Sequence, residues 1–327
     1  MAKHSDSGQY WPALVYAARN MRPATFELRF LLPRFWPTWL LIGCMRLAAW
    51  LPLPLIVSSG SLVGELLYLL ARERRRVAAI NLRIAYPDAS PRRLRQLNRA
   101  CFRSVSIGIL EIGLVWWAPA RVVALTEIVG IENLERELSG GRGAMLLTAH
   151  FTCIEVGLPV LARYATLQAM YKRPRNRLMD SFMERHRGKF TAVIAGHHAP
   201  IGLIRGLKRG HAMWYAPDQD FGGKDTVFVT LFGVEATALT APARIAGMAG
   251  VAVMPCCIER LPRGRGYRLT IRPPLPDFPS GDQIRDALTI NQATESLILQ
   301  NPEQYLWIHK RYKRRPDGTF GIYPEHV

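Results

Sequence analysis

The feature that most restricts the fold of this chain is a long apolar stretch near its start, residues Phe35–Ala71. Arg46 and the Pro52/Pro54 pair interrupt it, so it lacks the run of about 20 apolar residues that a clean membrane-spanning helix needs. Three tryptophans inside it suit the amphipathic zone of a bilayer surface, namely Trp36, Trp39 and Trp50. Basic residues flank both ends: Lys3, Arg19, Arg22, Arg29 and Arg34 precede the stretch, and Arg72, Arg74, Arg75 and Arg76 follow it. Without a charge asymmetry, a single span, an in-plane embedding and a buried core segment all stay open.

The second half of the chain has a different pattern, in which short apolar runs alternate with helical segments. The expected strands are 144–148, 167–171, 192–195, 212–216, 252–255 and 267–271, and the expected helices are 155–165, 178–189, 200–208, 240–249 and 281–300. This alternation predicts an α/β fold with a layered mixed sheet flanked by helices. We therefore divide the chain into an N-terminal membrane-anchoring and helical region, 1–118, and an α/β domain, 119–327. Within the first region Ser90 is the expected N-cap, and Pro91 the first residue, of a helix that reaches Trp117.

The composition combines high charge with high apolar content. Lys plus Arg number 43 and Asp plus Glu number 25, which gives a net charge of +18 and a pI near 10.3. Such an excess indicates an anionic partner: nucleic acid, a membrane or an acidic protein. The hydrophobic share of 49% and the mean hydropathy of +0.02 favour a membrane surface. The sequence shows neither a helix-turn-helix pattern nor an Arg/aromatic groove motif for nucleic acid.

The five cysteines form no C-x-x-C pair and have no histidine at a zinc-binding spacing. An odd number without a disulfide framework fits a reduced, cytosol-facing protein, in which free cysteines behave as small buried hydrophobes. The polar segment Met1–Tyr10 is not a secretory signal peptide, because no apolar run with a small-residue cleavage site follows it.

The sharpest chemical feature is His150-Phe151-Thr152-Cys153-Ile154-Glu155, between the strand that ends at Thr148 and a helical run. Catalytic groups of α/β sheets gather at the carboxyl ends of strands, where His150 falls. If His150 lies in the turn and Glu155 on the first helical turn, the carboxylate can hold one imidazole nitrogen and leave the other as a base. A capping carboxylate with a core histidine is the alternative interpretation. No Ser elbow, Walker loop or H-E-x-x-H zinc site competes elsewhere, and we interpret the Gly140–Gly143 segment as a turn.

Several longer strings carry a resemblance that covers the chain from about Phe30 to Asp317. They are LLPRFWPTWLLIG (31–43), AAINLRIAYPDAS (78–90), MWYAPDQDFG (213–222), VFVTLFG (227–233) and PEQYLWIHKRYKRRPDG (302–318). With these strings and an H-x-x-x-x-[DE] motif at His150 to Glu155, the chain resembles the late acyltransferases of lipid A biosynthesis, the lauroyl/myristoyl transferase family. The resemblance implies a glycerolipid acyltransferase-like fold with His150 and Glu155 as catalytic residues.

The resemblance also implies a substrate pair for this lipopolysaccharide biosynthesis step. The donor would be an acyl carrier protein thioester, and the acceptor a hydroxyl on an acyl chain of the Kdo-bearing, anionic lipid A precursor. The enzyme would work at the cytoplasmic face of the cell inner membrane, with no cofactor and no metal. By position, Arg187 and Asp218 match residues that the family treats as functional, with Asp220 the nearest alternative to Asp218.

One departure from the family lies in Tyr171–Asn176, where the register of the basic residues around Pro174 is shifted, so individual roles stay unassigned there. The basic run Lys310–Arg315 would dock the carrier, bind lipid head groups or form a solvated tail. Two alternatives to the lipid A assignment remain. The same O-acyl transfer could act on another glycolipid or an aminolipid, or the chain could be a non-catalytic basic membrane protein. Acyl-chain length, acceptor position and oligomeric state are not predicted.

Overall fold

The computed structural model describes residues 27–170, 173–195, 200–220, 222–223, 225–319 and 322–323. It begins with two 3-10 turns, η1 Leu28–Leu31 and η2 Pro33–Phe35, and the helices α2 Trp36–Ala48, α3 Leu53–Leu70, α4 Arg72–Ala85, α5 Pro91–Trp117 and α6 Pro119–Ala124. The apolar stretch is thus two helices, which part just before Pro52, a residue with extended backbone that serves as the N-cap of α3. The predicted cap of α5 is confirmed, because the Ser90 hydroxyl accepts the Arg93 N–H at 3.2 Å and Pro91 begins the helix.

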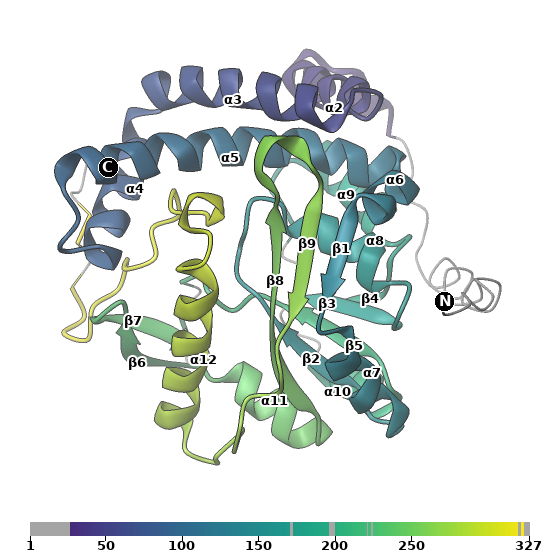
Figure 1. The fold of residues 1–327 in the computed structure, drawn as a ribbon, viewed down its shortest axis with the longest axis vertical. Coiled ribbons are helices and arrows are strands. Elements are labelled where there is room, and N and C mark those ends of the chain that lie inside the picture. The colour runs from purple at the N-terminus through teal and green to yellow at the C-terminus, as the bar shows by residue number, and fades with distance from the viewer. Residues whose placement is uncertain are drawn as a thin grey trace, which may run out of the picture.

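Helix α5 lies between the apolar helices and the rest of the molecule (Figure 1). Helix α3 runs along it in close contact: a Cβ added at Gly64 would meet the backbone of Arg103 at 2.4 Å. Both α3 and α5 are long and apolar enough to cross a membrane by length and composition alone. In the relevant windows, 61% of the residues of α5 are buried but only 22% of those of α3. Helix α5 is therefore a core helix, and α3 presents most of its surface to the outside.

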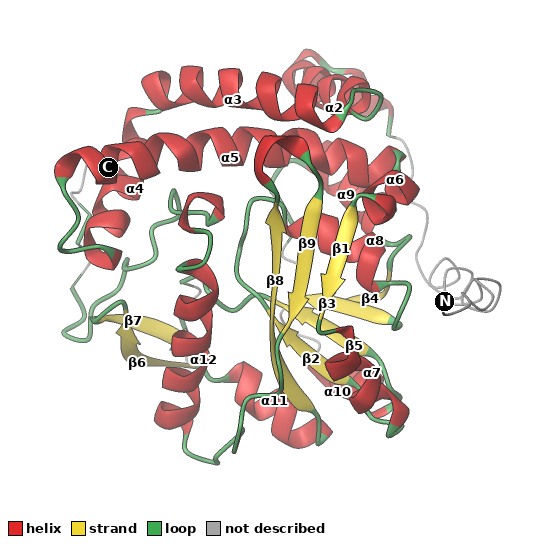
Figure 2. Ribbon diagram, viewed as in Figure 1, coloured by secondary structure: helices red, strands yellow, loops and turns green. Residues whose placement is uncertain are grey.

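The main sheet has seven strands in the order β1-β9-β8-β2-β5-β3-β4 (Figure 2). Their bounds are β1 Thr126–Val129, β2 Ala144–Leu147, β3 Leu167–Met170, β4 Thr191–Ala195, β5 Ala212–Tyr215, β8 Ala252–Arg260 and β9 Tyr267–Ile271. Every neighbouring pair is parallel except β8 and β9, which are antiparallel. A separate antiparallel hairpin joins β6 Thr226–Leu231 to β7 Val234–Leu239. The predicted α/β class, with a mixed sheet flanked by helices, is confirmed.

The remaining helices are α7 Ile131–Ser139, η3 Ile154–Val156, α8 Gly157–Leu161, α9 Arg177–Arg187, α10 Pro200–Lys208, α11 Ala241–Ala249, η4 Pro262–Gly264, α12 Gln283–Ile298 and η5 Pro302–Gln304. The helix expected over 155–165 is shorter, and divides into η3 and α8. Strand β1 and the hairpin were not among the expected strands. The start of the second predicted region coincides with α6, but the division of the chain at 118 stays a prediction.

The register of the central strands places three segments at one edge of the sheet. Leu147, the end of β2, pairs with Tyr215, the end of β5, and Ala169 of β3 pairs with Trp214. Residues of β2 and β5 are buried throughout, which fits strands covered on both faces. The loops after β2, β5 and β3 therefore leave the sheet side by side.

Candidate active site

His150 and Asp218 occupy equivalent places after neighbouring strands. His150 lies three residues beyond Leu147 of β2, and Asp218 three residues beyond Tyr215 of β5. Because these two strand ends are paired, the two side chains meet at the carboxyl edge of the sheet. Nδ1 of His150 lies 2.6 Å from Oδ1 of Asp218, and the His150 backbone N–H donates to Oδ2 at 3.1 Å.

Asp218 is enclosed by its partners. Its side chain is only 2% exposed, whereas that of His150 is 31% exposed. The phenol of buried Tyr305 donates a further hydrogen bond to Asp218. With Nδ1 held as a donor to the carboxylate, Nε2 is the imidazole nitrogen that remains for chemistry.

His150 and Asp218 each shift the pKa of the other. Burial would lower the pKa of His150, but the negative charge and hydrogen bond of Asp218 outweigh it and raise this pKa above its ordinary value. Burial alone would raise the pKa of Asp218, yet the charge of His150 and its hydrogen bonds lower it to about 2. Asp218 is therefore ionised at neutral pH, and it stabilises the protonated imidazole.

Glu155 does not hold the imidazole, contrary to the sequence prediction. It lies in the first turn after the loop, as expected, but its carboxylate accepts from both Nε and Nη2 of Arg187 on α9. The reason is the packing of α9, whose last turn brings a guanidinium fork opposite a carboxylate with matching geometry. The carboxylate that orients His150 is Asp218, and Glu155 contributes only its charge from a distance.

Arg187 is not part of an open cationic cluster, although its neighbours in sequence are basic. His186 is buried and stacks on Trp116, with ring centroids 4.8 Å apart. Burial, together with nearby Lys189 and Arg185, lowers the pKa of His186 to about 4, so it is neutral at physiological pH. Lys189 donates to the Trp116 carbonyl at 3.2 Å. His186 and Lys189 thus contact Trp116 of α5, whereas Arg187 lines the cavity.

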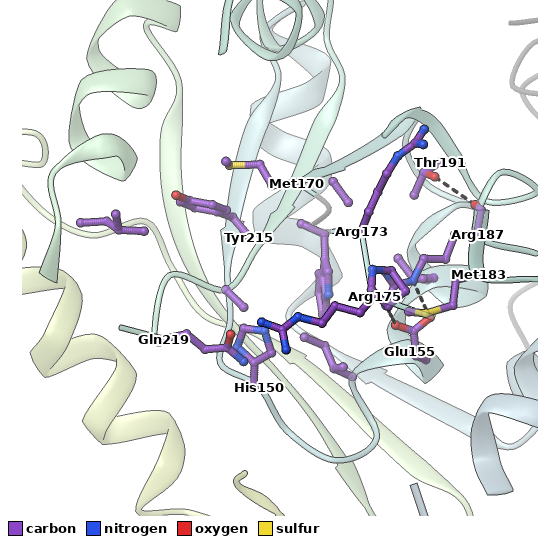
Figure 3. Close-up of a pocket in the computed structure, with 17 residues that line it drawn as sticks. His150, Glu155, Met170, Arg173, Arg175, Met183, Arg187, Thr191, Tyr215 and Gln219 are labelled. Carbon is purple, nitrogen blue, oxygen red and sulfur yellow. Dashed lines mark hydrogen bonds and ion pairs between the residues drawn. The ribbon is translucent and has the colours of Figure 1, made fainter. Parts of the chain in front are cut away.

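His150 and the Glu155–Arg187 pair line one cavity of about 470 Å³, a size that suits a small ligand or part of a lipid (Figure 3). The rest of its wall is mostly apolar and comes from β3, β5, α8, α9 and β7: Ile154, Leu158, Ala169, Met170, Met183, Trp214, Ala216 and Leu239. Five further polar side chains also reach it: Arg173, Arg175, Thr191, Tyr215 and Gln219. In Figure 3 the Arg175 side chain extends from the region of the Glu155–Arg187 pair toward the His150 ring, and Gln219 lies on the His150 side of the view.

Arg173, Arg175 and Asn176 around Pro174 are exposed, and the two preceding residues, Tyr171 and Lys172, lie outside the described residues. Arg173 forms an ion pair with Glu184 at 3.6 Å, and its side chain is 62% exposed. The basic residues around Pro174, to which the sequence analysis assigned no roles, thus include two that line the cavity, Arg173 and Arg175. Among the described residues, no group of three or more His, Cys, Asp or Glu side chains could hold a metal ion.

The C-terminal segment fixes the loop that carries His150. The Leu306 N–H donates to the His150 carbonyl at 3.1 Å, the Thr152 N–H donates to the Gln304 carbonyl at 2.8 Å, and Phe151 forms a bridge with Tyr305. Sequence reasoning missed Tyr305, although it lies within one of the long strings that carry the family resemblance.

The following basic run is not a uniform docking surface. Arg311 is buried, and Arg314 pairs with the buried carboxylate of Asp220. Of the two aspartates in the Pro217–Asp220 segment, Asp218 contacts His150 and Asp220 contacts Arg314.

An imidazole held by a buried aspartate at the edge of an α/β sheet, beside a mostly apolar cavity, is an arrangement that suits an enzyme acting on a hydroxyl. Comparisons with known proteins identify its family. The model of the bacterial lipid A biosynthesis acyltransferases matches residues 24–314. The chain is 34% identical to a lipid A biosynthesis lauroyltransferase of Escherichia coli (strain K12) over 296 residues, 90% of this chain and 97% of the relative.

Two further relatives of the same organism agree. A palmitoleoyltransferase is 33% identical, with 91% of this chain and 98% of the relative covered, and a myristoyltransferase is 25% identical, with 91% and 93% covered. The chain belongs to the bacterial lipid A biosynthesis acyltransferase family. It is an acyltransferase of late acyl transfer in lipid A synthesis, as the sequence predicts.

Proposed function

We propose that this protein transfers a fatty acyl group from an acyl carrier protein thioester to a hydroxyl on an acyl chain of the Kdo-bearing lipid A precursor. The observation that carries the proposal is the His150–Asp218 pair at the wall of an apolar cavity. A hydroxyl is a weak nucleophile at neutral pH, and a histidine base within hydrogen-bond reach is a common way to activate it. Family membership supplies the substrate class.

The reaction balances with His150 as the only proton carrier. Nε2 takes the proton of the acceptor hydroxyl while its oxygen bonds to the thioester carbonyl carbon. Asp218 stabilises the imidazolium that forms, in the manner of the carboxylate in hydrolase triads. When the tetrahedral intermediate collapses, the carbon–sulfur bond breaks and the imidazolium returns its proton to the leaving thiolate. The products are the new ester and the free carrier thiol.

The negative charge on the carbonyl oxygen needs a donor in the same cavity. Gln219 follows Asp218 directly and lines the cavity together with His150, so its carboxamide suits this role (Figure 3). Arg175 also lines the cavity and suits the phosphate or carboxylate groups of the substrates. The Glu155–Arg187 pair forms the opposite wall, where it fixes the loop after His150 to α9.

The apolar wall suits the acyl chain. Met170, Met183 and Trp214 face the cavity together with Leu158 and Leu239. An acyl chain inserted there gains roughly 0.8 kcal/mol for each methylene group removed from water. Both substrates carry acyl chains and anionic groups, which matches a cavity with an apolar wall and basic residues.

The charge of the whole protein supports the proposed location at the cytoplasmic face of the inner membrane. The net charge of +18 favours an anionic lipid surface and an acidic carrier protein. No cofactor or metal enters the proposed chemistry.

The test is mass spectrometry of the lipid product formed by purified enzyme from a defined lipid A precursor and a panel of acyl carrier thioesters. We expect one added hydroxyl-linked acyl chain, and a loss of about 10²-fold or more in rate for His150→Ala. His211→Ala, which changes a histidine outside the cavity, is the matched control and should retain activity. An unmodified precursor with every carrier would refute the substrates; transfer at the full rate by His150→Ala would refute the base.

A further inference from the structure

Figure 1 shows the helices α2 and α3 on the outer side of α5. These two helices and the turn between them carry many exposed apolar side chains. These residues, here called the apolar face, are Trp36, Leu40, Leu47, Trp50, Leu55, Leu62, Val63, Leu66, Leu69 and Leu70, each between 48% and 74% exposed. We propose that the apolar face lies in the plane of one leaflet of an anionic bilayer, so that the protein is embedded from one side and α3 does not span the membrane. Soluble proteins seldom expose a patch of this kind.

Helix α3 has two sides with opposite surroundings. Leu53, Ile56, Gly60 and Gly64 recur at helical spacing and are buried against α5. The serines of the helix donate to carbonyls of the preceding turn, as in Ser58 to Pro54 at 2.8 Å and Ser59 to Leu55 at 2.8 Å. Hydroxyls satisfied within their own helix are what a hydrocarbon environment requires, because it offers no other partner. The outer side of α3 therefore fits lipid.

Charges next to α3 exclude a spanning orientation. Glu65, on α3, forms ion pairs with Arg99 and Arg103 of α5, whose side chains are 52% and 45% exposed. If α3 crossed the bilayer, α5 would have to enter it as well, since the two helices touch along their length, and both arginines would meet hydrocarbon. Charged side chains at that depth are strongly disfavoured. In an in-plane orientation the same arginines lie at the margin of the apolar face, where they reach lipid phosphates.

The margin of the apolar face matches an anionic leaflet. Arg46 stacks over Trp50, 4.7 Å from the ring centroid, an arrangement that suits the boundary between head groups and acyl chains. Exposed arginines continue beyond the end of α3 on α4 and α5: Arg72, Arg74, Arg76, Arg92, Arg93 and Arg95. Their charge is complementary to acidic lipids and not to a second copy of this strongly basic chain.

The apolar face is connected to the wall of the active-site cavity. The Asn176 amide donates to the Thr38 hydroxyl of α2 at 2.7 Å, and Trp39 packs edge-to-face on Phe182 of α9. Arg175 and Met183, which line the cavity, belong to these same segments. An embedded α2 thus holds the cavity at the level of the head groups, where a lipid can enter from the leaflet. The entry of a lipid substrate into the cavity rests on the proposed function, whereas the proposed orientation of α3 does not.

The first experiment measures binding to vesicles of phosphatidylethanolamine and phosphatidylglycerol by flotation. The double variant Leu62→Asp, Leu66→Asp should bind roughly 10²-fold more weakly or worse, because two exposed leucines that would insert into the lipid are lost. Ile284→Asp on α12 is the matched control: its side chain is 60% exposed but lies outside the apolar face, so binding should be unchanged. Circular dichroism checks that the variants are folded. Equal binding by the double variant would overturn the proposal.

The second experiment separates embedding from spanning. Spin labels are attached to cysteines at Leu55 and Leu69, in a chain in which the exposed Cys44 is replaced by Ser. Residues 14 positions apart on a helix are separated by about 21 Å along its axis. An in-plane helix puts both labels at a similar shallow depth, as judged by collision with oxygen and a water-soluble nickel complex. Labels at opposite surfaces of the bilayer, with a label at Leu62 near its centre, would overturn the proposal.

A third experiment measures transfer to an acceptor dispersed in detergent, where the enzyme does not need to bind a bilayer. It separates a failure of membrane binding from a failure of the proposed function. We expect the double variant to be active on the dispersed acceptor and inactive on the acceptor in vesicles. Sedimentation of the wild type without lipid tests whether the apolar face instead contacts a second copy of this chain. A dimer that the double variant dissociates, together with absence of vesicle binding, would assign the apolar face to a second copy and overturn the proposal.

Discussion

Asp218 has the residue-scale role that the sequence attributed to Glu155. It is buried, it accepts two hydrogen bonds from His150, and Tyr305 supplies a third. A carboxylate with this many donors stays ionised and keeps the imidazole ring in one orientation. His150 is then poised as a base whose free nitrogen faces the cavity.

Tyr305 is the residue whose contribution can be isolated most simply. Tyr305→Phe removes the phenol that donates to Asp218 and leaves the bridge with Phe151, which is made by backbone atoms. Since a hydrogen bond to a charged group contributes about 1.5–3 kcal/mol, we expect kcat to fall by roughly tenfold or more. Tyr312→Phe is the control, because that buried phenol donates to the Leu231 carbonyl instead. Equal effects of the two variants on kcat would contradict a specific role for Tyr305.

The sequence predicts residues that form the site, but it does not predict which of their side chains contact each other. His150 stands after a recognisable strand, and the family resemblance points to Glu155, Arg187 and Asp218. The partner of each carboxylate depends on distances that no single sequence shows. Glu155 reaches a guanidinium 32 positions away, and Asp218 an imidazole 68 positions away, because α9 and β5 pack against the same loop.

At the scale of elements, α5 connects the apolar helices to the catalytic loop through a buried polar network. Arg260 of β8 donates to both oxygens of Glu111 at 2.6 Å, and Tyr267 donates to Glu111 at 2.9 Å. Arg260 also donates to Ser104, whose hydroxyl lies 2.6 Å from that of Thr152. The network therefore joins α5, the β8–β9 pair and the loop that carries His150.

Glu111→Ala should destabilise the fold strongly. It leaves the guanidinium of Arg260, with a side chain 7% exposed, without its counter-charge, a change that costs about 3–5 kcal/mol. The measurement is the free energy of unfolding from denaturant titration in detergent. Glu127→Ala, which removes a surface partner of Arg268, is the control and should cost no more than about 1 kcal/mol. A loss for Glu111→Ala as small as that of the control would contradict the role of the network.

Gly108 tests the contact between α5 and the loop. A Cβ at this position would meet the Thr152 carbonyl oxygen at 2.1 Å, so Gly108→Ala must move the loop that begins at His150. We expect the rate of transfer to fall by roughly tenfold or more, since small displacements of reacting groups are costly. Gly202→Ala on α10 is the matched control, because a Cβ there meets nothing within 4 Å. Unchanged kinetics in both variants would show that the loop is not set by α5.

Elements with a cap residue or a buried apolar run in the sequence were predicted well, and elements without such a pattern were not. The cap at Ser90 and the buried runs of β2 and β5 are visible in the sequence. Strand β1, with only four residues and alternating exposure, carries no such run. The hairpin β6–β7 also escaped prediction, although its first strand lies within a string that carries the resemblance. The pairing of that strand with β7 depends on a turn at Phe232 and Gly233, both with positive φ.

At the scale of the whole molecule, the net charge of +18 should attract the acidic, carrier-bound donor that we propose. An acidic carrier is attracted over a distance that salt shortens, to about 10 Å at 0.1 M ionic strength. For a detergent-dispersed acceptor, kcat/KM for the carrier-bound donor should fall severalfold as salt is raised. A short pantetheine thioester with the same acyl chain is the control donor and should respond little. The same salt dependence for both donors would contradict attraction of an acidic carrier.

The central claim is that Asp218, and not Glu155, orients and charges the His150 base. A base acts only when unprotonated, and the pKa of His150 is raised, so the wild-type rate should fall as pH drops through a value above about 6.5. Asp218→Asn removes the charge that raises this pKa. The acid limb of kcat/KM should then move to lower pH while kcat falls by about 10²- to 10⁴-fold.

Glu155→Gln, measured alongside, changes the carboxylate that pairs with Arg187. The pH profiles of wild type, Asp218→Asn and Glu155→Gln, recorded with the same carrier thioester and lipid A precursor, therefore test the claim directly. We predict a clear downward shift of the acid limb for Asp218→Asn and a much smaller one for Glu155→Gln. A larger shift for Glu155→Gln, or a wild-type rate in Asp218→Asn, would contradict it.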